Sequence, residues 1–329
     1  FELSQMEYVV IGIILLVAEL AYFRIADRCN IIDKPNERSS HTRVTLRGGG
    51  VIFLIGAWIW VAFFGIHYVW FMTGLTLIGL VSFADDVRST PNIVRLAVQF
   101  TAMMLMFINL GLYSSTTWWL IVPALIVCVG IINAYNFMDG INGITGCYSL
   151  AVIAPLAYLN RDIHFVDESL LAVTALSAGV FLVFNFRKKA KCFAGDVGSV
   201  SIAFILLFAL GRLVMATGNP VYLLFLGVYG ADTVLTIVHR IKLGENLGEA
   251  HRKHAYQLMS NELGMRHTLV SVIYMTVQLA ISFGLTAIND TTGQWIYFCM
   301  VIAVLALGYL VFMKKFYYLH EQYLQSRKQ

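Results

Sequence analysis

The stretch 96–138 reads LAVQFTAMMLMFINLGLYSSTTWWLIVPALIVCVGIINAYNFM and contains no Lys, Arg, Asp or Glu. It is long enough for two membrane-spanning helices, because one helical span needs about 20 apolar residues. The two helices are predicted to meet in a turn near Gly111 to Thr117. The whole chain of 329 residues is 59% hydrophobic and 13% charged, with a mean hydropathy of +0.74, whereas a soluble domain is about 25% charged. The chain is therefore predicted to be an all-α integral membrane protein.

Other uncharged stretches extend the same pattern along the chain. Residues 48–84 fit two more helices, separated at Gly65-Ile-His67. Among the rest, 148–159 is short and 199–216 contains Arg212. Together the candidates predict about eleven transmembrane helices; the remaining ones are 7–24, 169–186, 221–238, 267–287 and 295–313.

The positive charges are distributed unevenly, and this bias predicts the orientation of the chain in the membrane. All of the 23 Lys and Arg except Arg161 and Arg212 fall in 24–47, 85–95, 139–147, 187–198, 239–266 and 314–329. The prediction is one polytopic domain over 1–329, with a periplasmic N-terminus, a cytoplasmic C-terminus and cytoplasmic loops 25–48, 85–95, 139–147, 187–198 and 239–266. The net charge of +4 follows from this bias, so no nucleic-acid partner is predicted.

A polar stripe ends the opening stretch. Asn133, Asn136 and Asp139 are three residues apart and share one face of a helix, after which Gly140 and Gly143 loosen the chain. A polar stripe at a membrane surface costs free energy unless it binds something. These side chains therefore predict a site at the cytoplasmic end of the helices.

Two further acidic motifs lie at predicted helix ends. The adjacent Asp85 and Asp86 repel each other, which favours a bound cation or a shared proton; the alternative is that both cap the helix that follows. Asp196 lies between Gly195 and Gly198, where glycines allow close approach of a ligand and a helix start offers free N–H groups to an anion. Lys191 comes just before it.

Basic motifs occupy two other loops. His251 and His254 share a face if their segment is helical, and with Arg252 they suit phosphate oxygens better than zinc, since no cysteine lies nearby. The alternative is a basic segment lying on anionic lipid. His41 and the glycine-rich run that begins at Arg47 form a weaker phosphate signal in the first loop.

Asp232 is predicted to lie within a span. A buried carboxylate in a membrane is a candidate functional group. The alternative is an ion pair with Arg240 or Arg212.

Acids close to cations, with no cysteine ligand, suit Mg²⁺ and a polyphosphate. With lipid alongside, the predicted chemistry is phosphoryl transfer between a soluble nucleotide and a membrane-borne acceptor. A secondary transporter is the alternative, but it predicts charges near the bilayer midplane and paired repeats, and no repeat is visible. A catalytically silent scaffold for polysaccharide assembly is a further alternative, and it has no need of three separate acids.

Five motifs in this order resemble those of the polyprenyl-phosphate N-acetylhexosamine-1-phosphate transferases, a glycosyltransferase 4 type of enzyme. They are PNERSSH with RGGG, ADD, NAYNFMDGINGITG, AGDVGS and EAHRKHAYQ, and they lie within 33–257. The resemblance implies ten or eleven helices in the bacterial inner membrane, a cytoplasmic active site and often a homodimer. It also implies transfer of a sugar-1-phosphate from a UDP-sugar to undecaprenyl or dolichyl phosphate, with release of UMP.

By position, the resemblance implies that Asp196 and Asn136 bind Mg²⁺, with Mn²⁺ as a substitute. Asp85, Asp86 and Asp196 would be catalytic. Of the acidic pair, Asp85 would remove any residual proton or orient the acceptor, and Asp86 would support the metal or Arg95. The predicted substrate-binding residues are Arg95 for the pyrophosphate, Asn142 and Phe193 for the uracil, and His251, Arg252, His254, Asn133, Asp139, Lys191, Arg47 and His41.

Two departures from the family pattern narrow the prediction. Asn142 stands where many bacterial members carry Asp, so a role as a second acid is not expected there. His-Arg-Lys-His replaces the three consecutive histidines of the peptidoglycan branch, which argues against a MurNAc-pentapeptide donor. The motif is more similar to the branch that initiates O-antigen synthesis, whose donors include UDP-GlcNAc, UDP-FucNAc and UDP-QuiNAc.

Overall fold

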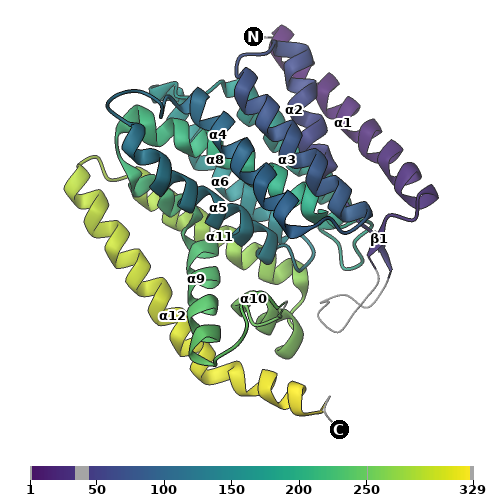
Figure 1. Ribbon diagram of the computed structural model, residues 1–329, viewed down its shortest axis with the longest axis vertical. Helices are drawn as coiled ribbons and strands as arrows, with labels where there is room; N and C mark the ends of the chain where they lie inside the picture. The colour runs from purple at the N-terminus through teal and green to yellow at the C-terminus, as the bar shows by residue number, and fades with distance from the viewer. Residues whose placement is uncertain (1, 34–43, 250, 327–329) are drawn as a thin grey trace.

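The computed structural model describes residues 2–33, 44–249 and 251–326, and within them it is mainly helical (Figure 1). Each predicted span is a helix. The long elements are α1 Glu2–Arg28, α2 Val51–Phe64, α3 Val69–Val87, α4 Asn92–Leu110, α5 Ile121–Met138, α6 Ile144–Ile163, α7 Glu168–Asn185, α8 Gly195–Thr217, α9 Gly227–Lys242, α11 His267–Thr286 and α12 Thr291–Ser326. Short elements are the 3₁₀ turns Trp118–Leu120 and Pro220–Leu226, α10 Ala255–Gln257 and the π turn Leu258–Glu262.

Nine of these helical segments, within the described part of the chain, are long and apolar enough to cross a membrane. The predicted count was about eleven. The helix α2 has only 14 residues, and α6 ends in the polar residues Asn160, Arg161 and Asp162. The protein is therefore a multi-pass, all-α membrane protein, in which α2 and α6 are less apolar or shorter than the other helices.

The predicted turns lie where they were expected. The helix α2 ends at Gly65, which has φ of 88°, and α4 ends at Gly111, which has φ of 74°. Residues other than glycine rarely adopt this left-handed conformation, so each glycine ends its helix and lets the chain reverse.

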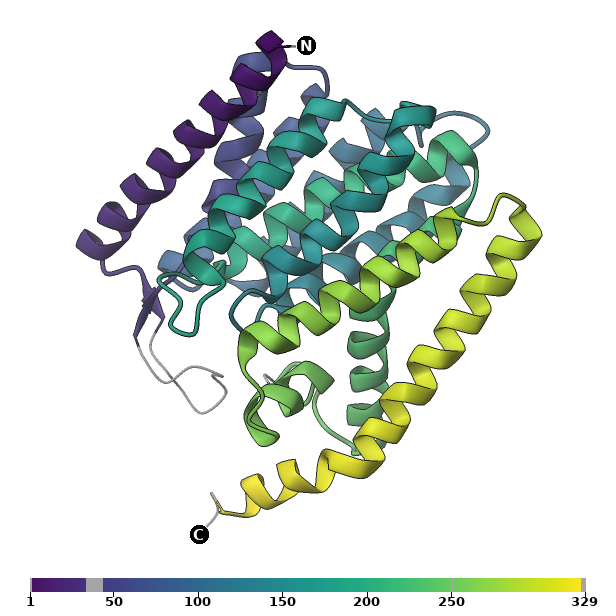
Figure 2. The ribbon, with the colours of Figure 1, turned by 180° about the vertical axis from the view of Figure 1, so that it is seen from behind.

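The helix α8 forms the centre of the bundle. It packs against α2, α3, α4, α5 and α6. In its most apolar stretch of 18 residues, 83% is buried. By contrast, α1 and α12 lie at opposite outer edges of the molecule, as both views show (Figures 1 and 2). In their most apolar stretches of 18 residues, only 28% of α1 and 17% of α12 is buried. The apolar side chains of the outer helices are therefore left for lipid.

Several helices run beyond the predicted loop boundaries. Asp85 and Asp86 lie in the last turn of α3, Arg95 lies in the first turn of α4 and Asp196 lies in the first turn of α8. The loop 139–147 is shorter than predicted because α6 already begins at Ile144, and α12 continues to Ser326 instead of ending near 313. Charged side chains do not interrupt backbone hydrogen bonding, so a change in polarity does not mark the end of a helix.

At one end of the bundle, the connections between helices gather. The strands β1 Ile32–Asp33 and β2 Thr45–Leu46 form a small antiparallel pair there, and Leu46 also makes a parallel β-bridge with Cys192. The elements α9 and α10 and the last part of α12 extend past this end of the bundle (Figures 1 and 2). The predicted site residues lie at this end.

Candidate active site

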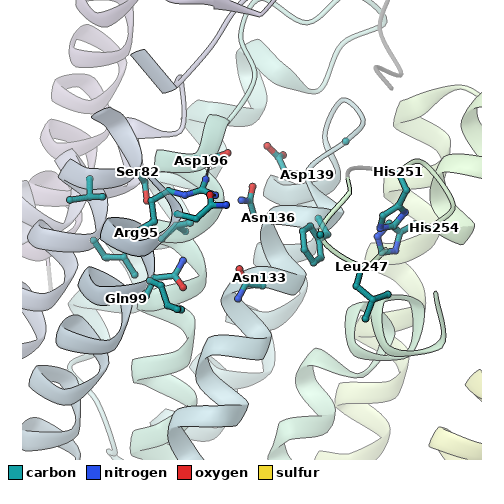
Figure 3. Close-up of a pocket in the computed structure, with 18 of the residues that line it drawn as sticks. Ser82, Arg95, Gln99, Asn133, Asn136, Asp139, Asp196, Leu247, His251 and His254 are labelled. Atoms are coloured by element: carbon teal, nitrogen blue, oxygen red, sulfur yellow. Dashed lines mark hydrogen bonds and ion pairs between the residues drawn. The ribbon is translucent and has the colours of Figure 1, made fainter. Parts of the chain in front are cut away.

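A cavity of about 560 Å³ opens among α3, α4, α5, α8 and the described residues of the segment 247–257, which are 247–249 and 251–257. Its lining includes seven of the predicted site residues, drawn in the close-up (Figure 3). They are Arg95, Asn133, Asn136, Asp139, Asp196, His251 and His254. Apolar side chains, among them Leu96 and Phe137, complete the lining. The motifs that are far apart in the sequence therefore converge in one place.

Arg95 joins two of the predicted catalytic acids. Its Nη1 donates to Asp85 Oδ2 at 2.7 Å and to Asp196 Oδ2 at 3.4 Å, while Nη2 donates to Asn92 Oδ1 at 2.8 Å. The other oxygen of Asp85 accepts the backbone N–H of Thr90 at 2.6 Å. Both oxygens of Asp85 are therefore bonded to the protein, and Asp196 is the carboxylate of this pair that lines the cavity.

Asp86 holds the start of α8 and not that of the helix that follows it in sequence. Its carboxylate accepts the backbone N–H groups of Asp196 and Val197, each at 2.9 Å. Arg47 Nε donates to the same carboxylate at 2.7 Å, and Arg47 Nη2 reaches Asp196 at 3.4 Å. The side chain of Asp86 is fully buried. Its contacts place it with Arg47 and the helix start, whereas the sequence interpretation paired it with the metal or Arg95.

The glycine-rich segments contact each other. A Cβ on Gly198 would lie 2.6 Å from the Cα of Gly50, so no side chain fits between the starts of α2 and α8. The backbone N–H groups of Gly49 and Gly50 donate to the carbonyls of Phe193 and Ala194 at 2.9 and 3.0 Å. In the structure, Gly50 and Gly198 allow two stretches of this chain to approach each other closely.

The polar stripe faces the cavity, although the helix ends before its last member. Asn133 and Asn136 lie on α5, and the Oδ1 of Asn136 accepts Ser199 Oγ at 3.3 Å. Asp139 follows the last residue of α5 and accepts Thr145 Oγ1 at 2.5 Å. Burial raises the pKa of Asp139 to about 6, although the hydrogen bond from Thr145 opposes this change.

His251 and His254 lie across the cavity from Arg95 (Figure 3). They come from a non-helical segment, yet their ring centroids are 5.0 Å apart. Burial lowers the pKa of His251 to about 3, so this imidazole is neutral. His251 Nδ1 and His254 Nε2 are buried and have no hydrogen-bond partner among the described residues. A buried polar atom without a partner is costly, so these nitrogens mark places where a ligand would bind.

Arg252 points away from the two histidines. Its Nη2 donates to Glu262 Oε1 at 2.8 Å, and its guanidinium carbon lies 4.1 Å from the ring centroid of Tyr323. His320 Nδ1 is 2.8 Å from the same oxygen of Glu262. Burial would raise the pKa of Glu262, but hydrogen bonds from His320 and Arg252 lower it. Arg252 therefore joins its segment to α12 and does not line the cavity.

Three other predicted residues do not line this cavity. Asn142 Nδ2 donates to the carbonyl of Arg187 at 2.8 Å, and the backbone N–H of Phe193 donates to the carbonyl of Leu46 at 2.8 Å. Lys191 is exposed. His41 lies outside the described residues.

The cavity also includes residues that the sequence did not single out, chiefly Asn92 and Tyr256. The hydroxyl of Tyr256 donates to the carbonyl of Phe137 at 2.9 Å. Tyr256 lies two residues after His254 in the same motif, and Asn92 lies three residues before Arg95, on the same helix face. Helical spacing would have found Asn92, whereas nothing in the sequence indicated the contact of Tyr256.

Comparison with known proteins agrees with this geometry. The model of glycosyl transferase family 4 matches residues 68–213, a range that holds Asp85, Arg95, Asn136 and Asp196. A probable undecaprenyl-phosphate N-acetylglucosaminyl 1-phosphate transferase of Bacillus subtilis is 28% identical over 277 residues, covering 77% of this chain and 76% of the relative. An undecaprenyl-phosphate alpha-N-acetylglucosaminyl 1-phosphate transferase of Thermotoga maritima is 27% identical, covering 88% and 92%.

A more partial similarity extends to the peptidoglycan branch. A phospho-N-acetylmuramoyl-pentapeptide-transferase of Thermotoga maritima is 25% identical over 213 residues, covering 59% of this chain and 67% of the relative. The family match, the relatives and the convergence of the motifs on one cavity confirm the resemblance. Over residues 68–213 the chain is similar to glycosyl transferase family 4, and over most of its length it is similar to the two N-acetylglucosaminyl 1-phosphate transferases.

Proposed function

We propose that the protein transfers an N-acetylhexosamine-1-phosphate from a UDP-sugar to undecaprenyl phosphate and releases UMP. The product would be a lipid-linked sugar pyrophosphate that begins synthesis of an O-antigen or a related surface polysaccharide. The two relatives named above that cover more than three quarters of the chain are N-acetylglucosaminyl 1-phosphate transferases, one of them a probable one, which makes UDP-GlcNAc the first donor to test. UDP-FucNAc and UDP-QuiNAc are the next.

The observation that carries this proposal is the composition of the cavity. Arg95 supplies a cation, Asp196 supplies a carboxylate, and His251 and His254 supply buried nitrogens without partners. Leu96 and Phe137, which are 45% and 47% exposed, place apolar surface at the same cavity. A charged nucleotide and a lipid phosphate both find matching chemistry here.

The donor groups fit a magnesium ion. Asp196 and Asn136 both line the cavity, and Ser199 links their positions through its bond to Asn136. Mg²⁺ keeps several waters and needs one or two protein oxygens, so a carboxylate and an amide suffice. The described residues contain no cluster of three or more His, Cys, Asp or Glu that would hold a metal alone. When bound, the ion would offset negative charge on the diphosphate; Mn²⁺ would suit the same ligands.

The protein residues then act mainly by positioning charge. In the reaction, an oxygen of the lipid phosphate attacks the sugar-bearing phosphorus, and the bond from that phosphorus to UMP breaks. Most of a phosphate monoester is already a dianion at pH 7, so a strong general base is unnecessary. Arg95, held by Asp85, reduces the repulsion between the two anions. Asp85 would thus contribute by holding Arg95 in position.

A double displacement through an aspartyl-phosphate is the mechanistic alternative. Both oxygens of Asp85 already accept hydrogen bonds, so Asp196 is the better nucleophile for that route. Exchange of labelled UMP into UDP-GlcNAc without lipid acceptor would support the covalent route, and absence of exchange would support direct attack.

We place the cavity at the cytoplasmic face of the bacterial inner membrane. The Lys and Arg of the chain gather in the connections at this end of the helices, as in cytoplasmic loops. The homodimer implied by the family resemblance belongs to this proposal as well.

Purified protein with undecaprenyl phosphate, Mg²⁺ and single UDP-sugars provides the test, with UMP release as the readout. We expect release with at least one UDP-N-acetylhexosamine and none with UDP-MurNAc-pentapeptide. Asp196→Asn should lower kcat by about 10²-fold or more. Asp27 is an exposed acid in the last turn of α1. It provides the control Asp27→Asn, whose kcat should stay within about two-fold of the parent value. Near-normal turnover of Asp196→Asn would remove Asp196 from the metal site, and no release with any donor would refute the function.

A further inference from the structure

Asp232 is a buried carboxylate of α9 that the proposed reaction does not use. It is 4% exposed. The sequence interpretation paired it with Arg240 or Arg212, but Arg240 bonds to Glu245 and to backbone carbonyls, and Arg212 bonds to the carbonyls of Phe165 and Asn109. Asp232 therefore has a different set of partners.

Five donors surround this carboxylate. Oδ1 lies 3.0 Å from the backbone N of Ala255, 3.2 Å from Thr236 Oγ1 and 3.4 Å from His254 Nδ1. Oδ2 accepts the hydroxyl of Tyr274 at 2.6 Å and the backbone N–H of Tyr256 at 3.4 Å. An ionised carboxylate only accepts hydrogen bonds. The ring nitrogen that faces it must therefore carry a hydrogen.

The other nitrogen of the same ring belongs to a side chain that lines the cavity. His254 is 1% exposed, and its Nε2 is buried without a partner among the described residues, although the residue lines the cavity. Phe137 and His251 pack on this ring, with centroids 6.4 and 5.0 Å away, and limit its rotation. A histidine whose Nδ1 is committed to a carboxylate presents Nε2 in a fixed direction.

We propose that Asp232 is a positioning residue for His254, holding hydrogen on Nδ1 so that Nε2 is reserved for the sugar-phosphate end of the donor. This inference rests on the proposed function for the identity of the donor. Asp232 never touches substrate, since it is enclosed by α9, α10 and α11. Its two bonds to the backbone of 255–256 also fix where the histidine leaves the chain.

A purely structural role for Asp232 is the rival explanation, and a double-mutant cycle separates the two. Asp232→Asn should lower kcat for UDP-GlcNAc by about ten-fold or more in the parent protein. In a His254→Gln background, the same change should cost less than about two-fold, because the residue through which Asp232 acts is gone. Equal losses in both backgrounds would overturn the proposal.

A matched control comes from an acid that pairs with the same segment outside the cavity. Glu245 also pairs with a residue of this segment, Lys253, but does not line the cavity. Glu245→Gln should leave kcat within about two-fold of the parent value. A loss as large as that of Asp232→Asn would indicate that any acid near the segment is needed, and would count against the proposal.

A spectroscopic measurement tests the pair without turnover. In protein labelled with ¹⁵N-histidine, with the His254 signal assigned by its loss in His254→Gln, Nδ1 should be the protonated nitrogen. Adding UDP-GlcNAc with Mg²⁺ should change the Nε2 signal, whereas UMP, which lacks the sugar phosphate, should not. A free-state ring protonated only on Nε2 would overturn the proposal. If the pair has the expected tautomer but no UDP-sugar binds or reacts, the proposed function fails and the Asp232–His254 pair stands.

Discussion

At the residue scale, the acids in and around the cavity have different roles. Asp86 binds the start of α8, Asp85 binds Arg95, and Asp232 binds His254. Asp139 and Asp196 remain to line the cavity. The identical side-chain chemistry of these residues concealed this division, since a sequence shows that a carboxylate is present and not which donors surround it.

Asp139 predicts a pH dependence of stability. Its pKa is raised by burial from 3.8 to about 6, so its contribution to folding is complete below about pH 4 and is lost as pH rises through 6. Asp139→Asn cannot ionise. From pH 4 to pH 7, the unfolding free energy of this variant should therefore rise relative to the parent by on the order of 2 kcal/mol.

Chemical unfolding in detergent micelles, followed by circular dichroism at several pH values, measures this difference. A constant difference between variant and parent across that range would contradict the assignment. The same substitution should lower turnover, because the carboxylate lines the cavity.

At the element scale, the contact between α2 and α8 fixes the relation of two motifs. Their starts meet at Gly50 and Gly198, and Arg47 and Asp86 close the same corner with an ion pair. The sequence showed both glycine motifs and placed both at helix starts. It did not show that they contact each other, because that contact depends on how the helices between residues 50 and 198 pack.

Gly198→Ala should destabilise the protein by about 1–3 kcal/mol, since its Cβ would lie 2.6 Å from the Cα of Gly50 and backbone atoms have no room to yield. The midpoint of thermal unfolding measures the loss. Gly179 on α7 is the matched control, because a Cβ there meets nothing within 4 Å. Gly179→Ala should be neutral or stabilise by up to about 1 kcal/mol; equal effects of the two variants would show that the close contact is unimportant.

The membrane helices could be predicted from the positions of the uncharged stretches. A long uncharged stretch such as 96–138 has few alternatives to spanning a bilayer, and positive φ at Gly65 and Gly111 ends helices where glycine was already visible. Boundaries were less predictable, because Asp196 and Arg95 remain inside helical turns. The convergence of the motifs was predicted because their acids and cations together suit Mg²⁺ and a polyphosphate. The contacts of Arg252 with Glu262 and Tyr323 were not predicted, because Tyr323 lies on α12, which carries no motif.

At the scale of the whole molecule, α12 supports one wall of the cavity from outside. It crosses the outer edge of the bundle and returns to the segment 251–262, where His320 and Tyr323 contact Glu262 and Arg252. Met313 and Tyr309 pack against Leu258 in the same region. The wall that carries His254 is therefore stabilised by residues far along the chain.

His320→Ala should loosen this wall without unfolding the bundle. It removes one of the two partners of Glu262 and leaves a buried carboxylate less satisfied, at a local cost of about 1–3 kcal/mol. Amide hydrogen exchange in 251–262 should become at least about five-fold faster, and UMP release should fall. Tyr318, which is 52% exposed, provides the control Tyr318→Ala. Unchanged exchange in His320→Ala would show that α12 does not support the wall.

The late position of α12 in the chain also affects how the protein matures. A ribosome makes this helix after every other element described here, so Arg252 and Glu262 are made before their outer partners Tyr323 and His320. Until α12 is made, residues 251–262 lack these contacts. The docking of α12 would therefore complete the outer support of residues 251–262 only after the rest of the described bundle has been made.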